Sequence, residues 1–364
     1  MDSDWPGQRH TPTFTLSDST DGPAFASPLG TASWNHDGFS HDPGFLASQE
    51  ELRCILFTIA QSAAPTRAVS PAAQEYTREH PPEAERVPLR PALSKTQRVE
   101  YLKNYVGQVA PWLDMFDSQC TFRVQIPALA RTFPALLYAI LAISARQMER
   151  KEGKQDSFDS IELYQEAIRL LSPLLQSPDP KVVAVCVLLR CLEMMSARAQ
   201  DWRRHLEGRT ALFDAFGING FSRGLLQAIF WCYVRMDKQV STLLRPSKWL
   251  APDCHEDDAA QRFKAAQSPD MQANYAGYLC AKTCELVSDR TQFVALATPN
   301  ECTGETFHHR WFRIWDDLQQ WFHNRRMELL PVHTTHTKPF PQFLFLHWAA
   351  ISSNHFLTLL ASCF

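Results

Sequence analysis

The run VVAVCVLLRCLEMMS occupies residues 182–196 and is apolar on nearly every side of a helix. A helix without a polar face must be buried by neighbours on several sides. Two charged residues, Arg190 and Glu193, interrupt the run. We therefore expect this helix at the centre of the fold, with other helices packed around it.

Two amphipathic helices are expected next along the chain. The first covers residues 201–216, with Asp201 as its N-cap and Gly217 as the left-handed residue that ends it. The second covers residues 222–244, with apolar residues at helical spacing. We expect both to lie against residues 182–196. The first helix has an apolar stripe of Trp202, Leu206, Leu212, Phe213 and Phe216.

The remaining sequence predicts further helices and no strand with alternating apolar and polar residues. The segment 110–131, which contains Pro111 and Pro127, reads as a loop. Residues 251–269 read as a surface excursion. The sequence therefore predicts an all-α fold, a multi-helix bundle or solenoid-like regulatory domain preceded by a disordered N-terminal segment. The other expected helices span residues 47–62, 95–109, 133–149, 157–175, 271–296, 307–324 and 343–363.

The N-terminal residues 1–47 differ in composition from the rest of the chain. They hold five prolines, five glycines and six aspartates against Arg9 alone, so this segment carries a charge of about −5. The absence of periodicity predicts disorder. The aromatic residues among the aspartates are also typical of an acidic activation segment, and a low-complexity tail is the alternative. Residues 48–94 follow as a short helix and a proline-rich linker.

Composition excludes several classes of protein. The net charge of the 364 residues is −3, which does not favour electrostatic coating of nucleic acid or anionic lipid. The ten cysteines contain no CxxC pair, so no zinc-cluster spacing is present. Cys280 and Cys284 share a helix face, and we expect them to pack rather than to bind metal. Neither a secretory signal nor a membrane span is predicted, and the cysteine usage suits a reducing compartment.

A search for catalytic motifs finds none that is convincing. The chain lacks G-x-S-x-G, a Walker A loop and G-x-G-x-x-G. Two aspartate pairs, at 257–258 and 316–317, lack the later acid of a DDxxD motif. The histidine pairs at 308–309 and at 333 and 336 do not match HExxH. We therefore assign no catalytic, cofactor-binding or metal-binding residue, and no cofactor.

Charged residues inside the apolar helices predict structural contacts. Arg190 and Glu193 lie in the first helix of the central trio, and Arg235 and Asp237 lie in the third. Buried charges persist only when they are paired. We expect an ion-pair network that joins the three helices, with Trp202 contributing to stability.

The residues resemble a known family at many positions in the same order. The similarity covers about residues 95–364 and is to the fungal-specific transcription factor regulatory domain of zinc binuclear cluster transcription factors. The motifs are Tyr101-Leu102-Lys103-Asn104-Tyr105, Ala110-Pro111-Trp112-Leu113-Asp114, Phe122, Pro127–Ala130, Pro134–Leu137, Ala139–Arg146, Asp201–Gly208, Gly224–Trp231, Arg235, Asp237, Phe340-Pro341 and Ala349–Asn354.

This resemblance implies an all-α regulatory domain over residues 95–364. In the family such a domain follows a six-cysteine zinc cluster that binds DNA. This sequence departs from that pattern, because its first cysteine is Cys54 and its first 47 residues are acidic. The apolar helix that runs to Phe364 has no C-cap, so we expect the domain to be incomplete.

The sequence thus predicts a nuclear transcription regulator that acts through protein partners, either the transcription machinery or related transcription factors. DNA would be reached only indirectly or through a missing module, and no membrane is expected. Control of a specialised metabolite gene cluster is a possible role implied by the resemblance. A non-DNA-binding cofactor or inhibitor of related zinc-cluster factors is the alternative, and a metal-dependent all-α enzyme is third.

Overall fold

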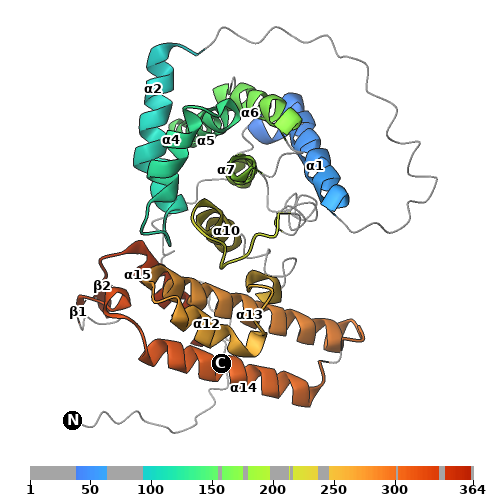
Figure 1. Ribbon diagram of the computed structural model, residues 1–364, viewed down its shortest axis with the longest axis vertical. Coiled ribbons are helices and arrows are strands. Elements are labelled where there is room, and N and C mark those ends of the chain that lie inside the picture. The colour runs from blue at the N-terminus through green and yellow to red at the C-terminus, as the bar shows by residue number, and fades with distance from the viewer. Residues whose placement is uncertain are drawn as a thin grey trace, which may run out of the picture. The chain divides into compact units, whose positions relative to one another are not determined.

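A computed structural model describes residues 38–63, 93–154, 158–174, 179–196, 213, 216–236, 246–300, 302–335 and 341–361. All of them belong to one compact unit, Asp37–Phe364. The described residues are almost entirely helical, so the predicted all-α class is confirmed (Figure 1). The α-helices are α1 Pro43–Ala63, α2 Lys95–Asn104, α3 Ala110–Leu113, α4 Ile126–Ala130, α5 Pro134–Glu152, α6 Asp159–Leu171, α7 Pro180–Ser196, α10 Leu225–Met236, α12 Ala259–Ala265, α13 Pro269–Ala295, α14 Gly304–His323 and α15 Trp348–Ala361.

Shorter elements connect these helices. The 3-10 turns are η1 Gly38–His41, η5 Ser172–Leu174, η6 Pro246–Trp249, η7 Glu256–Asp258 and η8 Met327–Leu329. Two π-helical turns, η3 Tyr105–Val109 and η4 Thr121–Gln125, adjoin α3 and α4. Strands β1 His333–Thr335 and β2 Gln342–Leu344 pair antiparallel, with His333 opposite Leu344.

Helix α7 is the buried element that its sequence predicts. Residues Val182 to Glu193 are all buried. Helices α5, α6 and α10 contact it, and Figure 1 shows α7 between the α5–α6 pair and α10. Because neighbours cover several of its sides, the helix needs no polar face.

Helix α5 begins at Pro134 and ends at Gly153, whose φ of +67° is the left-handed conformation that glycine adopts at a helix end. Its residues from Ala139 to Arg146 are all buried. The helix packs on α2, α6 and α7. It therefore joins the N-terminal helices into one core.

Buried charges in this core are paired. Arg190 Nη1 lies 3.1 Å from Glu193 Oε2, and the Tyr164 hydroxyl donates to Glu193 Oε1 at 2.6 Å. The Glu149 carboxylate accepts from the Ser160 backbone N–H and hydroxyl at 3.0 and 2.5 Å. These contacts tie α7 and α5 to α6, and they satisfy charges that would otherwise be costly to bury.

The C-terminal helices assemble around α13. Helices α12, α14 and α15 all contact it. Trp321 of α14 donates its indole N–H to the carbonyl of Gln272 at 2.7 Å. Phe263 of α12 stacks on Tyr275 with ring centroids 4.8 Å apart. Aromatic side chains therefore provide much of this part of the core.

Several sequence-based boundaries were wrong. Residues 110–131 are largely helical, because Pro111 and Pro127 stand at N1 or N2 of α3 and α4, where proline is tolerated. The segment 251–269 contains η7 and α12, and Phe263 is buried there. A small hairpin precedes α15, so the last helix begins at Trp348 and not at 343.

The start of the fold also differs from the prediction. Helix α1 begins at Pro43, four residues before the expected start, and Asp42 Oδ1 accepts from the Phe45 backbone N–H at 2.9 Å. Phe39 and Phe45 are buried against each other, with ring centroids 4.6 Å apart. Residues 38–47, assigned from sequence to the N-terminal segment, are therefore part of the fold.

Candidate functional site

The segment that joins α3 to α4 is held by two aspartates. Asp114 accepts from the backbone N–H groups of Phe122 and Arg123 at 2.7 and 2.8 Å. Asp117 accepts from the backbone of Gln119 and Thr121. Burial raises the pKa of Asp114 to about 6, although both backbone hydrogen bonds lower it. The carboxylates thus fix a turn that returns the chain to η4.

Arg235, at the end of α10, reaches this segment. Its Nη2 donates to the carbonyls of Leu113 and Trp112 at 2.9 and 3.3 Å. Its guanidinium lies over the ring of Phe116, 4.8 Å from the centroid. Burial lowers the pKa of Arg235. The side chain therefore joins the last turn of α10 to α3.

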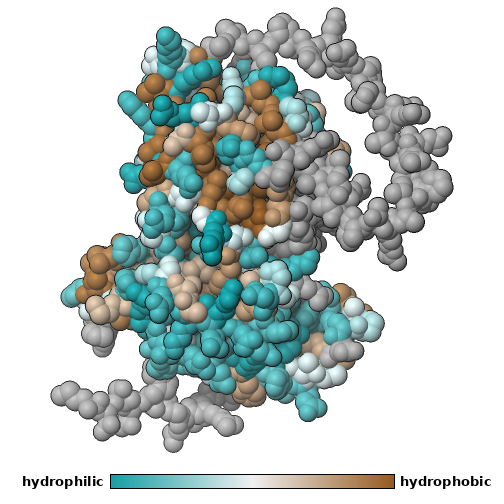
Figure 2. All heavy atoms as spheres, in the orientation of Figure 1, coloured by the Kyte–Doolittle hydropathy of each residue, from teal (hydrophilic) through white to brown (hydrophobic). Residues whose placement is uncertain are grey.

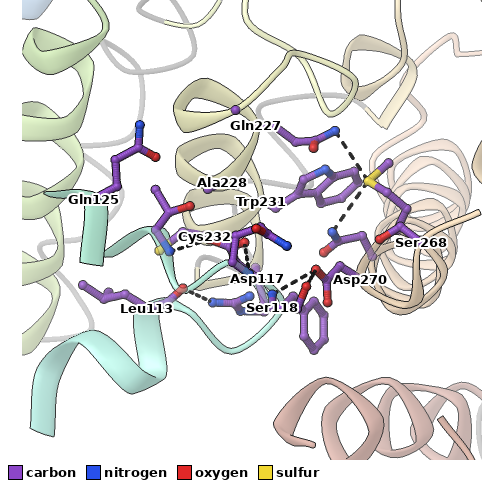
Figure 3. A pocket seen from close by; sticks show the side chains of 17 residues that line it. Leu113, Asp117, Ser118, Gln125, Gln227, Ala228, Trp231, Cys232, Ser268 and Asp270 are labelled. Carbon is purple, nitrogen blue, oxygen red and sulfur yellow. Dashed lines mark hydrogen bonds between the residues drawn. The ribbon is translucent and has the colours of Figure 1, made fainter. Parts of the chain in front are cut away.

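Helix α13 contacts the same segment through its first turn. Asp270 Oδ2 accepts from the Ser118 backbone N–H at 2.9 Å and from its hydroxyl at 2.7 Å, as Figure 3 shows. Residues 118 and 270 are far apart in sequence. This contact brings the start of α13 beside the turn that Asp117 and Arg235 hold.

A cavity of about 420 Å³ lies between the 113–125 segment, α10 and the start of α13. Figure 3 shows Gln227 and Trp231 projecting from α10 toward α13. Trp231 donates its indole N–H to the carbonyl of Gly220 at 2.8 Å, and Gln227 donates to the same carbonyl at 3.1 Å. The residues that line the cavity include Phe116, Asp117, Gln227, Trp231, Arg235 and Asn274.

Gly220 is required for this arrangement. A Cβ atom at this position would lie 2.5 Å from Cζ2 of Trp231 and 2.9 Å from the carbonyl oxygen of Trp249. Gly217 and Gly224 have φ angles of +61° and +58°, which glycine adopts without steric cost. The three glycines therefore serve the turn that precedes α10, and Gly224 lies just before this helix, which begins at Leu225 and not at residue 222.

Asn274 differs from the other polar groups of the cavity wall. Its side chain is buried, with 2 % of its surface exposed, and Oδ1 has no hydrogen-bond partner. Its Nδ2 lies 4.0 Å from the sulfur of Met271, which is a weak acceptor. Buried polar groups in folded proteins are nearly always hydrogen-bonded. The hydroxyls of Tyr105, Tyr275 and Tyr278 are also buried without a partner, but of these four residues only Asn274 lines the cavity.

The aspartate pairs noted in the sequence come partly together. Asp257 and Asp317 both line a second cavity, of about 960 Å³, beside α12, α13 and α14. Asp257 forms an ion pair with Arg313, and burial raises the pKa of Asp317. In the part of the chain that the structure describes, no group of three or more potential ligands lies where it could hold a metal ion.

The histidine and cysteine candidates are spread over the surface of other elements. His308 and His309 are exposed on α14, and His333 is exposed on β1. His336 lies outside the described residues. Cys280 and Cys284 lie on α13, the first partly buried and the second exposed. The structure does not gather these residues into one site.

The ion-pair network predicted to join the three central helices stays a prediction, because the described contacts of Arg190 and Arg235 lie within α7 or run from α10 to the α3 segment. Arg190 and Glu193 pair within α7, and Arg235 bonds to carbonyls of the α3 segment. Asp237 and Trp202 lie outside the described residues, as does nearly all of the predicted helix 201–216. A link through Asp237 therefore stays a prediction.

No pattern in the sequence indicates the cavity itself. Asp270 and Asn274 stand in an ordinary helical run, and Ser118 stands in a segment read as a loop. These segments are brought together by the hydrogen bond from Ser118 to Asp270, two residues that are 152 positions apart. The spacing of Gln227, Trp231 and Arg235 at i, i+4 and i+8 does place these three wall residues on one face of a helix.

Comparison with known proteins supports the family resemblance. No curated protein and no solved structure matches the chain. No helix among the described residues is both long and apolar enough to cross a membrane. Residues 100–247, which run from α2 through α10 and include two walls of the cavity, match the model of the fungal specific transcription factor domain, and the resemblance predicted from the sequence is thereby confirmed for this part of the chain.

Proposed function

We propose that the protein is a nuclear transcription regulator whose helical part acts through contacts with other proteins. The observation that carries this proposal is the match of residues 100–247 to the fungal specific transcription factor domain. Because these 364 residues contain no closely spaced set of cysteines, the proposal places no zinc-cluster DNA binding in them. The regulatory domain extends over residues 95–364 in this proposal.

Exposed apolar side chains support a role in protein contacts. Phe343 and Leu344 of β2 are more than half exposed, as are Leu346 and Trp348 before and at the start of α15. Figure 2 shows apolar side chains gathered at the β1–β2 hairpin. Clustered exposed apolar side chains are typical of interaction surfaces. This surface also favours the second candidate function, a cofactor or inhibitor of related zinc-cluster factors.

A tethering experiment tests the main proposal. The full chain is fused to a heterologous DNA-binding module, and transcription of a reporter with the matching site is measured in a fungal host. We expect a change in reporter output relative to the module alone. A fusion of residues 38–364, which keeps all of α1 and the buried Phe39 and Phe45, is the matched control for the acidic N-terminal segment, which we propose to be an activation segment. An unchanged reporter with both fusions would contradict a direct regulatory role.

A mobility-shift experiment separates the two candidates from a DNA-binding protein. The purified chain is titrated onto random duplex DNA at physiological salt, where nonspecific electrostatic binding is weakened. We expect no shift. A stable shift would contradict the proposal that DNA is reached through another protein or module. Transcript profiling of a deletion strain tests the finer proposal that the regulated genes form a specialised metabolite cluster.

A further inference from the structure

We infer that the cavity between the 113–125 segment, α10 and α13 binds a small neutral molecule that carries a carboxamide-like group on a flat apolar body. This inference rests on the proposed function and deepens it, because such a ligand would act as an effector of the regulatory domain. The cavity volume of about 420 Å³ lies within the range of small-molecule sites in proteins.

The first observation is the unsatisfied amide of Asn274. The residue is buried, with only 2 % of its surface exposed, and its Oδ1 has no hydrogen-bond partner. Leaving a buried acceptor without a donor costs free energy that a bound N–H group would recover. The side chain lines the cavity, so a ligand there meets it directly.

The second observation is that the cavity wall also contains a hydrogen-bond donor, the guanidinium of Arg235. Arg235 lines the cavity and is partly exposed, while its hydrogen bonds to Leu113 and Trp112 both start from Nη2. Its guanidinium thus keeps donors for a ligand acceptor. A carboxamide supplies both an N–H donor for Asn274 and a carbonyl acceptor for Arg235. Because a carboxamide is both a donor and an acceptor, it can hydrogen-bond to either Oδ1 or Nδ2 of Asn274.

Charge in the cavity favours a neutral ligand. Asp117 and Asp270 line the cavity together with Arg235. Both carboxylates are already hydrogen-bonded, Asp117 to backbone N–H groups of the 119–121 turn and Asp270 to Ser118. An anion would meet these carboxylates, and a cation would meet Arg235. A neutral amide avoids both repulsions.

The walls favour a flat apolar body. The Trp231 indole and the Phe116 ring line the cavity, with 4 % and 3 % of their surfaces exposed. Aromatic walls with a few converging polar groups are the usual composition of small-molecule sites. A ring bearing one carboxamide matches this combination.

Benzamide and methyl benzoate are a matched pair of probes. Both have a phenyl ring and a carbonyl, but only benzamide donates N–H bonds. We expect titration calorimetry or ligand-observed NMR on the full chain to detect millimolar binding of benzamide, and binding of methyl benzoate at least about tenfold weaker, which corresponds to about 1.4 kcal/mol.

Variants locate the binding. Asn274→Leu keeps the volume and removes the amide, so we expect it to lose benzamide binding while retaining its fold. Thr283→Val is the matched control, because Thr283 is equally buried on the same helix and bonds only to the carbonyl of Leu279. We expect this control to bind as the unchanged protein does. Should Asn274→Leu fail to fold, Ala228→Phe fills the cavity from α10 and is expected to abolish binding.

The outcomes that overturn the inference are specific. They are no benzamide binding by the unchanged chain, equal binding of both probes, or binding that survives both Asn274→Leu and Ala228→Phe. Binding is measured without a reporter gene. Failure of this inference is therefore distinguishable from failure of the proposed role in transcription.

Discussion

Helices α5–α7 and the cavity beside α10 both bury polar side chains, but they satisfy them differently. In α7, Arg190 and Glu193 form an ion pair, and Tyr164 completes the shell of Glu193. In α13, Asn274 is as buried as they are and its Oδ1 has no partner. A core that folds on its own satisfies its polar groups internally. The hydroxyl of Tyr105 in the core also lacks a partner, so what distinguishes Asn274 is that its unsatisfied atom belongs to a residue of a cavity wall.

The largest expected effect comes from breaking the paired core. Glu193→Ala removes the partner of Arg190 and the acceptor of the Tyr164 hydroxyl. We expect a loss of about 3–5 kcal/mol in unfolding free energy, because a buried charge then lacks its ion pair. Denaturant unfolding followed by circular dichroism measures it. The double variant Arg190→Met with Glu193→Leu removes both charges, and we expect it to be markedly more stable than Glu193→Ala. Equal stability of the single variant and the unchanged chain would contradict the paired-core interpretation.

Two asparagines provide the next comparison. Asn104 of α2 donates from Nδ2 to Ser144 Oγ and to Gln147 Oε1, each at 2.9 Å. We expect Asn104→Leu to cost about 1–2 kcal/mol, because it removes satisfied hydrogen bonds. Asn274→Leu should be neutral or stabilising by about 1 kcal/mol without ligand, because it removes an unsatisfied group. Thermal and denaturant unfolding of both variants test this difference. An equal loss in the two variants would show that Asn274 has a partner in solution.

The paired core was predictable from the sequence, whereas the cavity was not. The apolar run at 182–196 requires burial on several sides, and Arg190 and Glu193 within it require partners. The capping box of Ser94 and Gln97 at the start of α2 is likewise a contact between residues three positions apart. These features depend on neighbours within a few residues, so periodicity and capping rules describe them.

The cavity depends on contacts that no local pattern encodes. Ser118 meets Asp270, and Arg235 meets Leu113, across more than a hundred residues in each case. The prolines at 111 and 127 favoured a loop, but they stand at helix starts and leave the segment ordered enough to form a wall. The unsatisfied state of Asn274 is visible only once its surroundings are known.

Asp114 offers a pH-dependent test of the cavity region. Burial raises its pKa to about 6 in the folded chain, above its usual value. The folded state then binds a proton more tightly than the unfolded state, so the contribution of this group to stability rises as pH falls from 7 to 5. As the pH falls across this interval, we expect the free energy of unfolding of the unchanged chain to increase relative to that of Asp114→Asn. The increase should be at most about 1 kcal/mol after allowance for solvent screening. Denaturant titrations of both proteins at several pH values measure the difference. A difference that does not vary with pH would contradict a raised pKa.

The smallest expected effect comes from an ion pair with the same spacing as Arg190 and Glu193 but at the surface. Arg53 Nη2 lies 2.6 Å from Glu50 Oε1 on α1, where the side chains are 35 % and 53 % exposed. Glu50→Ala should change the unfolding free energy by no more than about 0.5 kcal/mol, because water screens and solvates both charges. The two pairs share the i, i+3 geometry of a helix. Comparing Glu50→Ala with Glu193→Ala in the same denaturant assay therefore compares an exposed pair with a buried one, and the loss in Glu193→Ala also includes the hydrogen bond from Tyr164. Similar losses in the two variants would show that pairing geometry, and not burial, sets the stability of the α5–α7 core.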